Sequence, residues 1–307
     1  MTDPYSISSL ISVLLGLGLA IPFNTCIVIV HLKVIRKKGK LSPSDVIFMA
    51  KGMVNVLLQG FMTVQGMLFV FSREVVYTRD VYSFLSAPVY SLTYFSFWMT
   101  FWLSAHYCTN ITHLSYGFFI WLKGIVSNFL SQILFLTALA MFIVNAPCSF
   151  YLQEESGLQS SENITKAPIK TLRVIFPCLV PVTFLGCFLP FCLSLLCLLL
   201  TFSFLVRHVW RVKNNDSGSS RPNLQAHVTA LRTIFFLLLI FVLFCISQAL
   251  RFISKSGQLG YSISMVGWNL RILSPSLETA VIFQASNKLK SIILRRFWTR
   301  RWRNTET

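Results

Sequence analysis

Four polar side chains lie inside long apolar stretches of this chain: Asn24, Asn55, Glu278 and Arg271. Burying a polar group without a partner costs roughly 2–7 kcal/mol. We therefore expect Asn24, Asn55 and Glu278 to face the interior of the fold. They form either a network that rearranges between two states or hydrogen bonds that only hold helices together. Arg271 has no acid within about one helical turn, and we expect it to face a wet cavity.

These residue types suit ionic and hydrogen-bonding contacts rather than catalysis. The sequence contains no nucleophile–base pair, its five histidines are scattered, and no two cysteines have C-x-x-C spacing. We therefore expect no enzyme activity, no metal site and no cofactor. Six of the eight cysteines lie within apolar runs, where cysteine behaves as a small hydrophobe. Only Cys148 and Cys178 approach the outer ends of their runs, and the sequence leaves open whether they pair.

Seven apolar runs position these groups, and each is long enough to cross a bilayer, which takes about 20 residues in a helix. The sequence thus predicts an all-α membrane protein, a bundle of seven transmembrane helices forming a single domain over residues 1–307. The approximate runs are Ile7–Val30, Val46–Phe71, Phe84–Thr109, Ile125–Ala146, Val174–Val206, Ile234–Phe252 and Ser262–Ala285.

The basic residues collect on alternate loops, which predicts the orientation. Most of the 27 Lys and Arg residues share one side, in the first loop, the loop around 207–228 and the tail at 287–307. Because cytoplasmic loops carry the excess of Lys and Arg, the C-terminus is predicted to be cytoplasmic and the N-terminus outside. An extracellular N-terminus at 1–6 and an outer loop at 148–173 follow from this orientation.

The formal net charge of +17 also suits a nucleic-acid partner, but its distribution argues against one. The charge is divided into short clusters beside the membrane, where each Lys or Arg gains about 1 kcal/mol at an anionic leaflet.

Two N-x-S/T sequons test the orientation. Asn163 lies in the predicted outer loop and is expected to be glycosylated, whereas Asn110 lies at the inner end of the third run and is not.

Three classes of seven-span protein fit this topology. Retinal proteins need a lysine in the middle of the last span, and Ser262–Ala285 contains none. Ion-coupled transporters place acids near the midplane, and the acids within these runs reduce to Glu278, with Asp45 at a boundary. A receptor needs only a cavity at one end and a mobile face at the other. A small-solute transporter remains the alternative from another class.

Several segments resemble the vertebrate type 2 bitter taste receptors in order, spacing and wording. They read LSPSD at 41–45, FFIWLK at 118–123, PFCLSL at 190–195, HVTALRT at 227–233 and PSLETAVIFQASNKLK at 275–290. The chain departs from the family where members often carry Arg (Asn55), His (Glu278) and a Leu-Lys pair (Thr109-Asn110). These departures indicate a divergent member. Type 1 pheromone receptors are the nearest alternative family.

The resemblance implies a bitter taste receptor in the plasma membrane. It implies that small bitter compounds bind in an outer transmembrane cavity and that the receptor activates a gustducin/Gi-type heterotrimeric G protein. Tyr94, Trp98 and Trp102 share one face of the third span by their spacing of four residues. That face is either a packing stripe or part of a pocket, and the resemblance favours the pocket. The expected ligand-binding residues are Tyr94, Trp98, Phe101, Trp102, Phe184, Phe244, Trp268 and Arg271.

At the cytoplasmic side, five basic residues border the space that is expected to open on activation. Each alone is typical of a solvated helix end, and the resemblance of the 227–233 segment to a family motif favours a conformational switch. The expected switch and G-protein residues are His208, Arg211, His227, Arg232 and Lys288.

Overall fold

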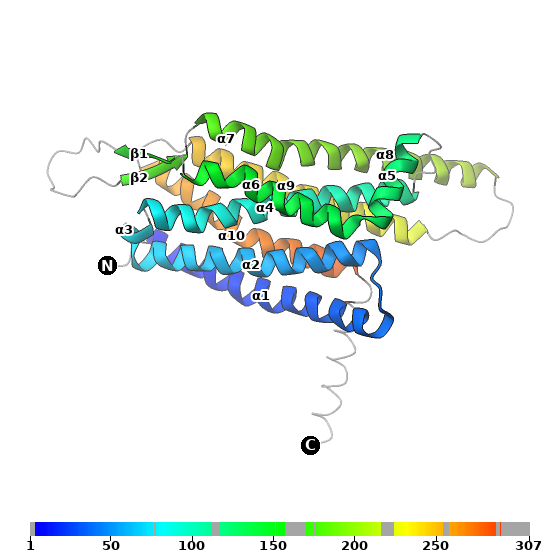
Figure 1. The fold of residues 1–307 in the computed structure, drawn as a ribbon, viewed down its shortest axis with the longest axis horizontal. Coiled ribbons are helices and arrows are strands. Elements are labelled where there is room, and N and C mark those ends of the chain that lie inside the picture. Colours follow the sequence, from blue (N-terminus) through cyan, green and yellow to red (C-terminus); the bar gives the residue numbers. More distant parts are fainter. Residues whose placement is uncertain are drawn as a thin grey trace, which may run out of the picture.

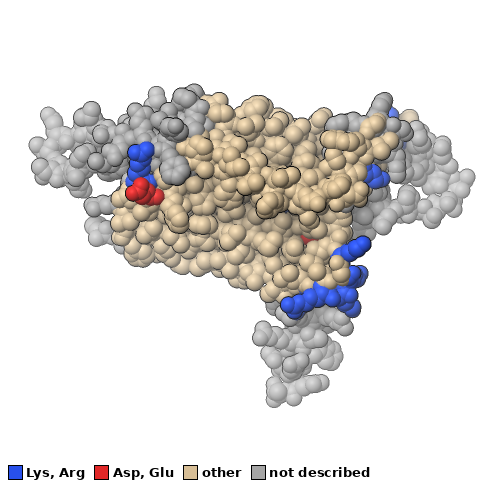
Figure 2. Space-filling view, viewed as in Figure 1, with Lys and Arg blue, Asp and Glu red and all other residues tan. Residues whose placement is uncertain are grey.

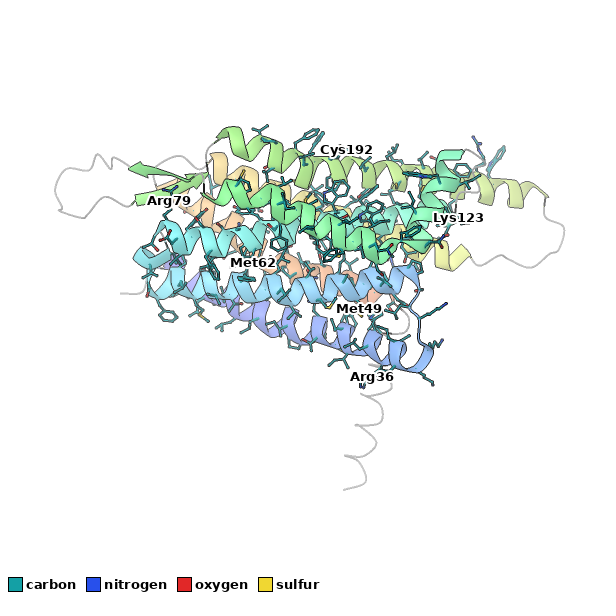
Figure 3. All side chains as sticks on the ribbon, in the orientation of Figure 1. Arg36, Met49, Met62, Arg79, Lys123 and Cys192 are labelled. Carbon is teal, nitrogen blue, oxygen red and sulfur yellow. The ribbon has the colours of Figure 1, made fainter. Side chains whose placement is uncertain are left out.

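The structure is a computed structural model of the full chain. It describes residues 4–76, 78–111, 117–150, 152–156, 170–174, 176–215, 224–253, 258–286 and 289. The long helices lie side by side in one bundle, with the N-terminus at one end (Figure 1). Arg79 lies at that same end, whereas Arg36 and Lys123 lie at the opposite end (Figure 3). We call these the N-terminal end and the basic end.

Seven helical segments of the described residues build the bundle, and this confirms the predicted all-α bundle of seven helices. They are α1 (Pro4–Lys38), α2 (Pro43–Phe71), α4 (Arg79–Ile111), α6 (Leu130–Phe150), the fifth span (Phe176–Asn215, in three parts), α9 (Leu224–Ile253) and α10 (Gln258–Ala285). Two short helices, α3 (Arg73–Val76) and α5 (Gly117–Asn128), connect them. The fourth run was predicted to begin at Ile125, but residues 125–128 belong to α5 and the spanning helix begins after Phe129.

Local chemistry explains the connection between α1 and α2. Gly39 takes a φ of 69°, which ends α1 because other residues rarely adopt that conformation. Its N–H donates to the Ile35 carbonyl at 2.7 Å. Ser42 then caps α2 by accepting from the Asp45 N–H at 3.3 Å, and Pro43 occupies the first turn, where a missing N–H costs nothing.

Five helices in the described part of the chain are both long and apolar enough to span a membrane: α1, α2, α6, the fifth span and α9. The remaining two, α4 and α10, are more polar because they hold their polar side chains inside the bundle. Helix α4 packs against α2, α6, α8 and α9, and α10 packs against α1, α2 and α9. Buried polar residues on these two helices include Ser91, Ser96, Arg271 and Glu278.

The fifth span is interrupted in its first third. It consists of α7 (Phe176–Thr183), a π-helical turn η1 (Phe184–Phe188) and α8 (Leu189–Asn215). As the long fifth run predicts, α8 continues through residues 208 and 211. Between α6 and α7 lies one feature absent from the sequence prediction, a two-stranded antiparallel sheet of β1 (Leu152–Ser156) and β2 (Lys170–Val174).

Exposed charge is concentrated at the basic end (Figure 2). Along the long sides the exposed surface is apolar, with Phe135, Phe202 and Leu196 each more than half exposed. An apolar belt between polar ends is what a lipid environment requires. The exposed Lys and Arg side chains at the basic end are Lys33, Arg36, Lys37, Lys38, Lys40, Lys123, Arg207 and Arg232.

Candidate functional site

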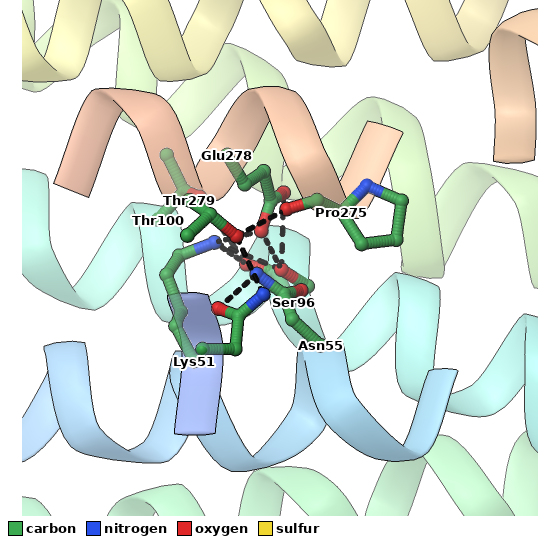
Figure 4. Close-up of polar contacts among 8 residues, drawn as sticks. Lys51, Asn55, Ser96, Thr100, Pro275, Glu278 and Thr279 are labelled. Carbon is green, nitrogen blue, oxygen red and sulfur yellow. Dashed lines mark hydrogen bonds and ion pairs between the residues drawn. The ribbon is translucent and has the colours of Figure 1, made fainter. Parts of the chain in front are cut away.

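A buried ion pair joins three helices at the centre of the bundle (Figure 4). The Lys51 ammonium of α2 lies 3.2 Å from the Glu278 carboxylate of α10. It also donates to the hydroxyl and the carbonyl of Ser96 on α4, at 2.8 and 3.1 Å. The Ser96 hydroxyl in turn donates to Glu278, at 3.0 Å from the nearer carboxylate oxygen. Lys51 is fully buried and Glu278 is 5 % exposed.

Lys51 was missed by the sequence reasoning, which treated its surroundings as an uninterrupted apolar run. The sequence does indicate this ion pair. A lysine within the apolar run 46–71 requires a partner, and Glu278 is an acid in another apolar run. The sequence prediction grouped Glu278 with the two asparagines alone, and the structure places its side chain in the interior. The structure shows that its direct contacts are Lys51 and Ser96.

The asparagines form a second set of contacts one residue away along α10. The Asn24 side chain of α1 donates to the hydroxyl of Thr279 and to the carbonyl of Ala20. Asn55 of α2 donates to the Asn24 side-chain oxygen at 3.5 Å. The Thr279 hydroxyl donates to the Pro275 carbonyl at 2.6 Å. Since Thr279 follows Glu278, the two sets connect α1, α2, α4 and α10 at one level of the bundle.

A second constellation lies nearer the N-terminal end, around Arg271 of α10. Arg271 is only 2 % exposed, and its guanidinium donates to the Tyr90 hydroxyl of α4 at 3.3 Å. The guanidinium carbon lies 4.7 Å from the ring centroid of Trp268 and 5.5 Å from that of Tyr90. Trp268 donates its indole N–H to Ser9 of α1 at 3.1 Å. Cation–π contacts of this kind are worth about 0.5–2 kcal/mol each.

The aromatic residues expected on one face of α4 lie against the neighbouring helices. Trp98 donates its indole N–H to the Leu185 carbonyl in η1 at 3.1 Å. Trp102 donates to the Thr137 hydroxyl of α6 at 3.3 Å. Phe101 lies between the two tryptophans in ring contact with both, with centroids 5.6 and 4.9 Å away. Both indoles are therefore engaged in helix–helix contacts.

Tyr94 and Phe244 belong to a buried aromatic core between α4, α8 and α9. Phe97 of α4 stacks on Phe241 of α9 at 3.6 Å and contacts Phe244 edge-on at 5.0 Å. Tyr94 lies 6.4 Å from Phe97 in the same core. The structure places Phe184 elsewhere: its side chain is 49 % exposed and stacks on Phe188.

The expected residues of the basic end are only partly described. Arg232 is exposed on α9. The backbones of His208, Arg211 and His227 are helical, but their side chains lie outside the described part of the structure. Lys288 and Asn163 lie outside the described residues altogether. The described part of this end contains one further pair, His31 of α1 and Asp45 of α2, at 3.5 Å.

Cysteine chemistry offers little for catalysis. Cys148, at the end of α6, is disulfide-bonded, and the side chain of Cys178 lies outside the described residues. The other six cysteines are free thiols. Among the described residues, no three His, Cys, Asp or Glu side chains come together as a metal site would require.

Comparisons with known proteins agree with this arrangement. The model of a family described as Taste receptor protein (TAS2R) matches residues 1–301. The chain is 24 % identical to taste receptor type 2 member 9 of Macaca mulatta over 84 % of its length and 83 % of the relative's. It is 28 % identical to type 2 member 31 of Homo sapiens over 86 % of both chains. It is 27 % identical to member 41 of Gorilla gorilla gorilla, covering 94 % of this chain and 96 % of that one.

Proposed function

Because the chain belongs to the taste receptor type 2 family, we propose that it is a bitter taste receptor of the plasma membrane that activates a gustducin/Gi-type G protein. The family match over residues 1–301 carries this proposal. The family is a class of membrane-embedded G protein-coupled receptors and not an enzyme class. Membership also removes the type 1 pheromone receptors as the alternative. In the proposed orientation the N-terminal end faces outside and the basic end faces the cytoplasm.

The proposed ligand site is the constellation of Arg271, Trp268 and Tyr90. Two rings and a guanidinium that are already in contact provide the mixture of apolar surface and placed polar groups that small ligands use. A buried guanidinium forms strong hydrogen bonds with carboxylate and other oxygen acceptors. The site should therefore favour oxygen-rich or acidic agonists, and it can hold cationic agonists only through the aromatic rings.

The proposed route to the cytoplasm runs through the aromatic core and the central polar contacts. Tyr94, Phe97 and Phe244 connect α4 to α9, and α9 carries His227 and Arg232 towards the basic end. The Lys51–Ser96–Glu278 contacts hold α2, α4 and α10 in one arrangement. Activation is a shift of population towards a state in which the basic end opens, because the agonist binds that state more tightly.

A compound screen tests the receptor proposal. Cells that co-express this chain and a chimeric G protein are exposed to a panel of bitter compounds, and calcium is recorded. We expect a response that requires both the chain and the G protein. The transporter alternative is tested separately with purified protein: agonist-dependent nucleotide exchange on the G protein supports the receptor, whereas substrate flux into liposomes without such exchange would support the transporter.

A further inference from the structure

The interruption of the fifth span leaves one main-chain carbonyl without its usual donor. In a π turn each carbonyl accepts from the N–H five residues later, and the Leu189 N–H does donate to the Phe184 carbonyl. The next carbonyl, that of Leu185, would accept from residue 190. That residue is Pro190, which has no N–H.

The missing donor comes from another helix. The indole N–H of Trp98 on α4 donates to the Leu185 carbonyl at 3.1 Å. The helices meet closely here, since a Cβ added at the adjacent Gly186 would lie 2.5 Å from the ring of Tyr94. In a bilayer no water is present to satisfy an exposed carbonyl, so a side-chain donor at this point contributes strongly to the stability of the π turn.

The π turn also decides which residues of the fifth span face the bundle. Its extra residue rotates the segment before it by about 100° relative to the segment after it, given 3.6 residues per helical turn. With this register Gly186 and Cys187 are buried, whereas Phe184 and Phe188 are exposed. Cys187 then lies against α9, with its sulfur 3.1 Å from that of Cys245. The packing of α4 and α9 on the fifth span thus depends on the turn being kept.

We infer that Trp98 is a positioning residue that holds the π turn of the fifth span by donating to the carbonyl that Pro190 leaves without a partner. A ligand that draws the indole N–H away competes with this hydrogen bond and releases the turn. The positioning role stands independently of the proposed function, whereas the signalling consequence rests on it.

A double-mutant cycle with Pro190 tests the positioning role. In Pro190→Ala the Leu185 carbonyl regains a main-chain donor, either the N–H of residue 190 in the π register or that of Leu189 in the α register. Trp98→Phe keeps an aromatic ring but removes the donor. The thermal midpoint of the purified full-length protein in detergent is measured for both single variants and the double variant.

We expect Trp98→Phe to lower the midpoint by about 3–8 °C in the native background, a loss in the range of one polar group left unsatisfied in an apolar environment. In the Pro190→Ala background the same change should lower it by less than half as much. Trp102→Phe is the matched control, because this indole donates to a side chain, that of Thr137, without a nearby proline. Its effect should be equal in the two backgrounds. An equal loss from Trp98→Phe in both backgrounds, or no loss in either, would overturn the inference.

Should Pro190→Ala fail to give folded protein, Trp98→His decides the question, because imidazole is smaller than phenyl but keeps a ring N–H. We expect Trp98→His to retain more thermal stability than Trp98→Phe; the reverse order, or equality, counts against the hydrogen bond. The signalling consequence is read in cells at matched surface expression, where Trp98→Phe should raise basal activity at least twofold. A stability cycle as expected with unchanged basal activity would retain the positioning role and reject only its link to receptor signalling.

Discussion

The strongest single test of the structure is to remove one charge of the Lys51–Glu278 pair. Glu278→Gln is nearly isosteric and leaves the Lys51 ammonium fully buried with only uncharged acceptors, the Ser96 oxygens and the new amide oxygen. At 3.2 Å and an effective dielectric constant of about 20, the lost attraction is about 5 kcal/mol. Breaking a buried pair by removing one partner costs about 3–5 kcal/mol in practice, in agreement with this figure.

We therefore expect Glu278→Gln to lower the thermal midpoint of the purified receptor by about 6–20 °C, taking 2–4 °C per kcal/mol. Lys51→Met should cost a similar amount, because it leaves the carboxylate buried. The double variant Lys51→Met/Glu278→Gln should recover most of the loss, since it removes both desolvated charges together. Lys33→Met is the matched control: this lysine is exposed on α1, and its replacement should change the midpoint by no more than about 1 °C.

The midpoints of the native protein, the two single variants and the double variant form a double-mutant cycle. Its coupling term measures the interaction between Lys51 and Glu278. Losses that add in the double variant would refute the reasoning, because they would mean that the two side chains do not interact in the folded receptor. A Glu278→Gln protein as stable as the native one would refute it as well.

Three further predictions concern ligand, glycan and switch. Arg271→Gln should weaken acidic agonists about 10- to 100-fold and cationic ones much less, as loss of a charge-assisted hydrogen bond implies, and dose–response curves for matched pairs measure it; equal weakening of both sets would make Arg271 purely structural. Asn163→Gln should abolish the gel shift produced by glycosidase; a persistent shift would move the glycan elsewhere. His227→Ala should raise basal signalling or abolish coupling while agonist binding is kept; unchanged signalling at equal surface expression would reduce His227 to a solvated helix end.

Much of the fold was predictable because the bilayer imposes a strong length requirement. Apolar runs of about 20 residues identified all seven spans, including α4. Helix α4 is more polar than the others because it lies between several helices and holds polar side chains inside the bundle. The boundary of α6 was less predictable. Residues 125–128 are apolar enough for a membrane span, but they belong to α5, and hydropathy alone does not locate the break at Phe129.

The candidate site was predictable in its residue types but not in its pairings. Interior positions for Asn24, Asn55 and Glu278 follow from the cost of leaving polar groups in hydrocarbon. Arg271 was predicted to face a wet cavity, whereas its side chain is 2 % exposed and contacts Tyr90 and Trp268. Which helix supplies each partner depends on how each helix is rotated about its axis and shifted along the bundle. The residue pattern of a single helix does not predict either quantity. Lys51 and Glu278 are 227 positions apart, and only their opposite charges within apolar runs indicate the pair. The contact between Trp98 and Leu185 is harder still, because its acceptor is a main-chain atom; Pro190 is its one sequence signal.

The two polar constellations share helices, and this determines how one can affect the other. Tyr90 and Ser96 lie on α4, and Arg271 and Glu278 lie on α10, so each of these helices contributes to both constellations. Seven residues separate Arg271 from Glu278, about 10 Å along a helix. A rigid α10 would transmit any displacement at Arg271 directly to the ion pair. Pro275 lies between them and removes one intrahelical hydrogen bond, which permits bending at that point.

Hydrogen bonds of Thr279, on the Glu278 side of Pro275, oppose that bend. Thr279 donates to the Pro275 carbonyl and accepts from Asn24 of α1, so the half of α10 that carries Glu278 is fixed to α1. If the agonist binds at Arg271 as proposed, it can move the half of α10 before Pro275 with little effect on Glu278 as long as the Asn24–Thr279 contact holds. Under that proposal, a displacement reaches the ion pair only when the Asn24–Thr279 contact breaks. The same hydrogen bonds would then both stabilise the bundle and set the energy needed for coupling.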